Sequence, residues 1–175
     1  MIKIIAIVIA VLIAGVLILA AMQPDTFRIQ RTAVIKAPPD RIFSILNDFK
    51  RWDAWSPWEK KDPGMKRTYG AATSGKGASY SWDGNGEVGQ GSMQIVESSP
   101  PSKLTLSLDF VKPMKAHNAV EFSLEPAGET TKVTWSMAGA TPFIGKIFHL
   151  FVDMDKMVGK DFDAGLASLK DTAEK

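Results

Sequence analysis

Two histidines and one glutamate are the side chains best placed for acid or base chemistry. His117 and His149 lie far apart, and neither has the spacing of a metal-binding motif. His149 falls beside the apolar stripe of a predicted helix, where it is either a packed histidine or a general base facing a cavity. Glu97 shares the parity of Met93 and Ile95, so it points inward or reaches solvent at its strand end. We treat Glu97 and His149 as possible polar groups of a cavity and assign no catalytic residue.

Glycine and cysteine patterns exclude several other kinds of site. Residues 84–89 match GxGxxG, but a strand pattern follows them instead of the helix that a dinucleotide site requires. We therefore interpret this segment as a hairpin turn. Residues 75–77 lack the rest of a phosphate-binding P-loop, and no serine lies in a GxSxG motif. The chain has no cysteine, which excludes disulfides, thiolate metal sites and a cysteine nucleophile. We expect no metal and no cofactor.

Composition argues against a nucleic-acid partner. The 175 residues include 21 Lys and Arg against 19 Asp and Glu, for a net charge of +2. Nucleic-acid-binding domains usually carry a clustered basic face, which this balance does not suggest. The length predicts one folded domain.

Aromatic residues on the predicted apolar faces are the most informative group. They either form an ordinary hydrophobic core or line a ligand cavity. The candidates for a cavity lining are Trp55, Trp58, Tyr80, Trp82, Phe110, Phe122, Trp135 and Phe148.

The elements that position these side chains follow from periodicity. Residues 27–36 predict a strand, and the segment after Pro38 predicts a short helix with an apolar stripe. From Met65 to Met137, apolar and polar residues alternate in short runs separated by Gly and Pro turns. This pattern is typical of an antiparallel meander with one apolar face.

The C-terminal segment predicts one long helix that begins near Thr141 and Pro142. Apolar residues recur in it at three- and four-residue steps as far as Leu169. Gly159 and Gly165 lie inside it and permit either close packing or a bend. Because the sheet must cover its apolar face, we expect it to wrap around this helix and leave space for an apolar cavity.

Residues 4–22 form an uncharged, almost wholly apolar run near the N-terminus. As a helix, the run would be about 28 Å long, close to the thickness of a bilayer core. The alternative is a cleaved signal peptide, but its apolar core is usually shorter, and Leu19-Ala20-Ala21 is a poor cleavage site. We therefore predict a transmembrane anchor over residues 1–23 and a separate domain over residues 24–175.

The orientation of this anchor is less clearly encoded. Lys3 precedes the apolar run, whereas Arg28, Arg31 and Lys36 follow it, so the positive-inside rule does not decide between the two orientations. A short charged start before an apolar run is built like an export sequence. We expect a single-pass protein of a bacterial-type cytoplasmic membrane, with an extracytoplasmic domain favoured.

Four short segments carry a recognisable pattern, one of them rich in tryptophan: residues 35–43 (IKAPPDRIF), 52–58 (WDAWSPW), 77–82 (GASYSW) and 131–135 (TKVTW). Together with the order of the predicted elements, they resemble the START-like, SRPBCC superfamily, and more closely its polyketide cyclase/dehydrase and lipid transport branch. The resemblance covers residues 27 to about 171. It implies an α+β helix-grip fold, with a curved antiparallel sheet of about seven strands around a long C-terminal helix.

Function is less narrowly implied, because one fold supports many activities. We expect a membrane-anchored domain that binds a hydrophobic small molecule or lipid in an internal cavity. The alternatives are a cyclase- or dehydratase-type enzyme that uses cavity acid/base residues, and a structural or stress-related module without a ligand. The expected partners are the apolar ligand and a membrane contacted through residues 4–22; the oligomeric state is left open.

Overall fold

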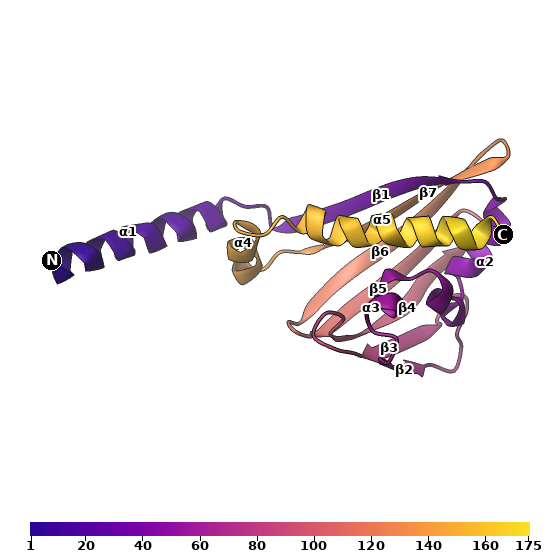
Figure 1. The fold of residues 1–175 in the computed structure, drawn as a ribbon, viewed down its shortest axis with the longest axis horizontal. Coiled ribbons are helices and arrows are strands. Elements are labelled where there is room, and N and C mark those ends of the chain that lie inside the picture. Colours follow the sequence, from indigo (N-terminus) through magenta and orange to yellow (C-terminus); the bar gives the residue numbers. More distant parts are fainter.

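The computed structural model describes residues 1–175 and shows a curved antiparallel sheet with helices packed on one side (Figure 1). Its strands are β1 (Thr26–Ile35), β2 (Lys66–Tyr69), β3 (Ser79–Asp83), β4 (Gln90–Ser99), β5 (Lys103–Lys112), β6 (Ala116–Ala127) and β7 (Thr130–Ala140). Its helices are α1 (Ile2–Ala21), α2 (Pro39–Leu46), the 3₁₀ helix η1 (Phe49–Ala54), α3 (Pro57–Lys61), α4 (Phe143–His149) and α5 (Met154–Ala173). The predicted helix-grip fold and its seven strands are confirmed.

The sheet is a meander from β2 to β7, and β1 pairs with β7 at its edge. Period-two alternation places Leu104, Leu106 and Leu108 of β5 in the core, as the sequence predicts. Helix α5 runs along this apolar face and contacts β1, while the short helices α2, η1 and α3 close the remaining space (Figure 1). Residues 84–89 form a turn between β3 and β4, which confirms the hairpin interpretation of the glycine motif.

The C-terminal segment differs from its prediction, because it contains two helices instead of one. Residues 150–153 interrupt the helical path between α4 and α5. The Asp153 carboxylate accepts a hydrogen bond from the backbone N–H of Lys156 and so caps the N-terminus of α5. The predicted long helix is thus α5 alone, and Thr141 and Pro142 precede the separate helix α4.

Gly159 and Gly165 serve close packing within α5. A Cβ on Gly159 would lie 1.9 Å from Nη2 of Arg31, whose guanidinium crosses the helix there. A Cβ on Gly165 would lie 2.7 Å from the ring of Trp135. Both distances are far shorter than a van der Waals contact, so a side chain at either position would push these groups away from α5.

Helix α1 projects from the domain (Figure 1). It is the one helix long and apolar enough to cross a membrane, with a mean hydropathy of 3.3, and most of its side chains are exposed. Only its last turns are covered: Ala20 is fully buried, and Gly15 and Val16 are partly covered. A helix with these properties serves as a membrane anchor or as a signal sequence.

Candidate functional site

The interior between α5 and the sheet is dominated by stacked aromatic rings. Phe122 and Trp135 face each other across β6 and β7, with ring centroids 5.0 Å apart. Trp135 also stacks on Phe162 of α5, with ring centroids 4.0 Å apart and 6° between the ring planes. Trp55 and Trp58 meet Trp135 edge-on at 5.5 and 5.7 Å. Trp135 is therefore the centre of the helix-to-sheet contact, and its edge-on contacts have the geometry that aromatic pairs favour.

A second group of rings continues this interior toward the β2 edge of the sheet. Tyr80 stacks on Trp82 at 5.9 Å, and Trp82 meets Phe110 edge-on at 5.8 Å. Phe49 and Trp52 of η1 join the two groups, since Phe49 stacks on Tyr80 and Trp52 contacts both Trp55 and Phe122. Seven of the eight predicted aromatic residues thus belong to one connected cluster.

The eighth candidate, Phe148, lies apart from the others. Its side chain is on α4 and 45% exposed. Conversely, the set predicted from the sequence did not include Phe49, Trp52 and Phe162, although all three are at least 96% buried within the cluster. The apolar stripe of α5 could have indicated Phe162, whereas η1 has no clear periodicity.

Two buried indole groups in this cluster have no hydrogen-bond partner. The Nε1 atoms of Trp55 and Trp135 are both buried and unpaired. By contrast, Nε1 of Trp52 donates to the carbonyl of Leu46 at 2.9 Å, and Nε1 of Trp82 donates to that of Val88 at 3.2 Å. A buried donor without a partner costs about 1–3 kcal/mol. Trp55 and Trp135 therefore offer two hydrogen-bond donors to any acceptor that reaches the interior.

A polar cluster at the edge of the aromatic interior was not anticipated from the sequence. Glu59 of α3 has a side chain only 9% exposed, and one of its oxygens accepts from Nε of Arg67 on β2 at 2.8 Å. Its other oxygen accepts from the Tyr80 hydroxyl at 3.0 Å. Arg67 also donates to the carbonyl of Met65 at 2.8 Å. These bonds fasten α3, and with it Trp58, to the β2 edge of the sheet.

Tyr80 acts in this cluster as a hydrogen-bond donor. Burial raises the pKa of the Tyr80 hydroxyl strongly, and the neighbouring negative charge of Glu59 raises it further. The hydroxyl therefore stays protonated at neutral pH. Because both oxygens of Glu59 are engaged by Arg67 and Tyr80, the cluster is better suited to holding α3 in place than to moving a proton.

The two possible polar cavity residues, Glu97 and His149, lie at opposite ends of the sheet. A register irregularity between Ile95 and Glu97 alters the alternation, so Glu97 is exposed and pairs with Lys103 at 3.5 Å. His149 ends α4 near the other end of the sheet, where its ring meets Phe27 edge-on at 6.4 Å. The structure does not bring these two groups together as an acid/base pair.

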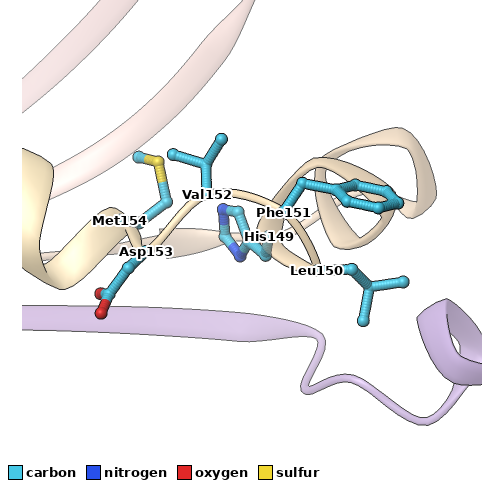
Figure 2. A pocket seen from close by; sticks show the side chains of 6 residues that line it. All are labelled: His149, Leu150, Phe151, Val152, Asp153 and Met154. Carbon is cyan, nitrogen blue, oxygen red and sulfur yellow. The ribbon is translucent and has the colours of Figure 1, made fainter.

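A surface pocket of about 440 Å³ lies where α4 gives way to α5 (Figure 2). One continuous segment lines it, from His149 to Met154. Met154 also packs against the hydrophobic core, so the pocket adjoins the end of α5 that meets the interior. The pocket lies at the same end of the domain as α1 (Figure 1).

Comparison with known proteins identifies the family. The family model described as polyketide cyclase / dehydrase and lipid transport matches residues 26–174. The chain belongs to this family. The matched span begins at β1 and ends within the last residues after α5, so it contains the whole helix-grip domain and excludes α1. No curated protein is similar enough in sequence to match.

Several solved structures share the fold of this chain at low sequence identity. Protein CV1439 from Chromobacterium violaceum superposes with a TM-score of 0.61 at 15% identity, covering 87% of this chain and 99% of its own. The Aha1 dimer from Colwellia psychrerythraea gives 0.60 at 18% identity, with 85% and 96% covered. DynU16, from the dynemicin biosynthetic locus, gives 0.57 at 15% identity, with 87% and 48% covered. These similarities establish the fold.

Proposed function

We propose that the protein is a membrane-anchored domain that binds a hydrophobic small molecule or lipid between α5 and the sheet. The observation that carries this proposal is the pair of unpartnered indole N–H groups of Trp55 and Trp135 inside the aromatic interior. Ligand sites are mostly apolar and contain a few polar groups that fix orientation. The family description, which includes lipid transport, supports the same class of ligand.

The chemistry of the interior defines what the ligand should contain. Its body should be apolar, because the rings around Trp135 offer apolar surface. Its polar end should carry an acceptor oxygen, such as a carboxylate, carbonyl or ester, since an indole N–H only donates. A fatty acid or another lipid with an oxygen-bearing end meets both requirements.

Ligand access requires α5 to move away from the sheet, because Phe162 of α5 now stacks directly on Trp135. The N-terminal half of α5 is held on β1 by Arg31, which pairs with Asp155 at 2.9 Å and with Asp163 at 3.3 Å. Both carboxylates are more than half exposed. Arg31 binds both oxygens of Asp155 and also reaches Asp163, so opening this end of α5 breaks an ion-pair network whose carboxylates are exposed to solvent. Water can solvate those carboxylates once the pairs are broken, so this step costs less than separating a buried ion pair.

The presence of helix α1 is consistent with a ligand that comes from the bilayer. Only residues 22–25 separate the end of α1 from the start of β1. Four residues reach at most about 14 Å, so a retained α1 keeps the domain next to the membrane surface. The pocket at residues 149–154 lies at this same end, beside the end of α5 that has to move in this proposal.

The proposal is tested by measuring binding of cis-parinaric acid, a fluorescent fatty acid, to the full chain and two conservative variants. Trp135→Phe and Trp55→Phe keep an aromatic ring but delete the donor. If each donor bonds the carboxylate, affinity should fall roughly 10-fold or more, since hydrogen bonds to charged groups contribute about 1.5–3 kcal/mol. Native mass spectrometry of the membrane-extracted protein should also detect a copurifying lipid.

Trp82→Phe is the matched control, because the Trp82 indole already donates to Val88. Its effect on affinity should be small even if its stability falls. An absence of probe binding by the wild type would refute the proposal. Equal losses of affinity in all three variants would show that the donors of Trp55 and Trp135 are not used.

A further inference from the structure

Helix α4 exposes its apolar residues and buries its charged one, the reverse of a helix on a soluble domain. Phe143, Ile144 and Phe148 are 49%, 62% and 45% exposed. Lys146, in contrast, is only 8% exposed. Its ammonium group donates to a carboxylate oxygen of Asp25 at 2.5 Å. The polar side of α4 therefore faces the protein, and its apolar side faces outward.

The apolar surface continues past the end of α4. Phe151 is 73% exposed, and its side chain and that of Leu150 project away from α5, on the side of α4 and α1 (Figure 2). We call the residues of this surface the α4 face: Phe143, Ile144, Phe148, Leu150 and Phe151. Three exposed aromatic rings on so short a segment are uncommon at a surface that meets only water.

The position of α4 against α1 indicates what covers this face. Helix α4 packs on α1 near the C-terminal end of α1, where Val16 is partly covered and Ala20 is fully buried. Along a helix axis, Val16 to Ala21 spans about 8 Å. If α1 crosses a bilayer, α4 therefore lies within about 8 Å of the end of the span. This agrees with the roughly 5–10 Å to which interfacial amphipathic helices are buried.

We propose that the α4 face inserts into the headgroup and acyl boundary of the lipid bilayer and holds the α4 end of the domain against the membrane. This inference rests on the proposed anchoring through α1. It assigns a second, independent membrane contact, which fixes the tilt of the domain and places the pocket at residues 149–154 at the lipid surface.

The experiment uses the absence of cysteine to introduce single labels into the full chain in phosphatidylcholine nanodiscs. An environment-sensitive NBD probe is attached in the variants Ile144→Cys, Phe148→Cys and Phe151→Cys. Nitroxide-labelled lipids then report the depth of each probe by quenching. We expect blue-shifted emission and several-fold stronger quenching at these positions than at Glu129→Cys. Glu129 is exposed in the turn between β6 and β7, far from α1 (Figure 1).

A fourth variant, Leu12→Cys, separates the failure of this inference from the failure of the anchor. Leu12 is 64% exposed on α1 and should be quenched by lipid nitroxides whenever α1 spans the bilayer. Quenching at Leu12 with none at the three α4 positions would overturn the inference and leave the anchor standing. No quenching at Leu12 would refute the anchor, and the inference with it.

Self-association of two chains is the remaining way to cover the α4 face. It would shield the probes from water without exposing them to lipid nitroxides. Blue-shifted emission without quenching, together with two copies of the chain per nanodisc by mass photometry, would therefore overturn the bilayer assignment in favour of a dimer contact.

Discussion

Gly165→Ala tests whether the ring stack at Trp135 is tight or has room to yield. In a helix interior, alanine is favoured over glycine by about 1 kcal/mol, so helix propensity alone predicts a more stable protein. The new Cβ, however, would lie 2.7 Å from Cζ3 of Trp135 and 3.1 Å from Cδ of Pro57. One neighbour is a ring and the other is part of a rigid pyrrolidine, so neither can relax like the end of a flexible side chain.

Trp135 has little freedom to move away from this Cβ. Phe162 stacks on its ring at 4.0 Å and Phe122 at 5.0 Å, while Trp55 meets it edge-on. Overpacking of a filled core typically costs about 1–3 kcal/mol. After subtraction of the propensity gain, we expect Gly165→Ala to lower the free energy of unfolding by up to about 2 kcal/mol. For a chain of this size, 1 kcal/mol corresponds to about 2–4 °C in Tm.

The assay is urea unfolding of the full chain in detergent, followed by tryptophan fluorescence. Ala164→Gly is the matched control, because Ala164 is the exposed neighbour of Gly165 on the same helix. It should cost about 1 kcal/mol and thereby measure the local propensity difference. If Gly165→Ala instead stabilises the protein by the amount that Ala164→Gly removes, space exists between α5 and Trp135. A tightly stacked interior would then be wrong.

Two further predictions concern the attachment of α5 and the independence of the domain. The Arg31 guanidinium lowers the pKa of Asp155, so this ion pair stabilises the fold above the unfolded pKa of about 3.9 and is lost as pH falls through the lower folded value. The urea midpoint of wild type should therefore fall more steeply below about pH 4 than that of Asp155→Asn; parallel curves would show that the pair adds nothing. A truncation that begins at Pro24 keeps Asp25 and all seven strands, so in mild detergent it should unfold cooperatively. Aggregation under those conditions would mean that α1 is part of the fold.

Much of the architecture could be predicted from the sequence because its periodicity is local. Alternation in segments such as residues 104–108 identifies strands and their inner faces, and these residues are buried as predicted. The apolar run at residues 4–22 identifies α1 by length and composition alone. Most of the aromatic cluster could be predicted for the same reason, since parity alone places Phe122 and Trp135 on the inner face.

Other features depend on contacts between residues that are distant in the sequence, and local sequence patterns do not reveal such contacts. The apolar repeat runs without interruption through residues 147–158, so nothing in it indicates that Asp153 starts a new helix. The irregularity before Glu97 depends on pairing between β4 and β5, which turns an apparently inward residue toward Lys103. The interaction of Glu59 with Tyr80 likewise requires α3 to pack beside β3.

The hydrogen bonding of the buried indole N–H groups also depends on tertiary contacts. Whether an indole N–H finds a partner depends on which backbone carbonyl lies within about 3 Å, and that is determined by packing across several elements. Trp52 and Trp82 find such carbonyls, whereas Trp55 and Trp135 do not. The sequence determined that tryptophans would fill this interior, because burial follows from apolar patterning. Only the tertiary structure decided which of them keep a free donor, because hydrogen bonding depends on direction and distance as well as on burial.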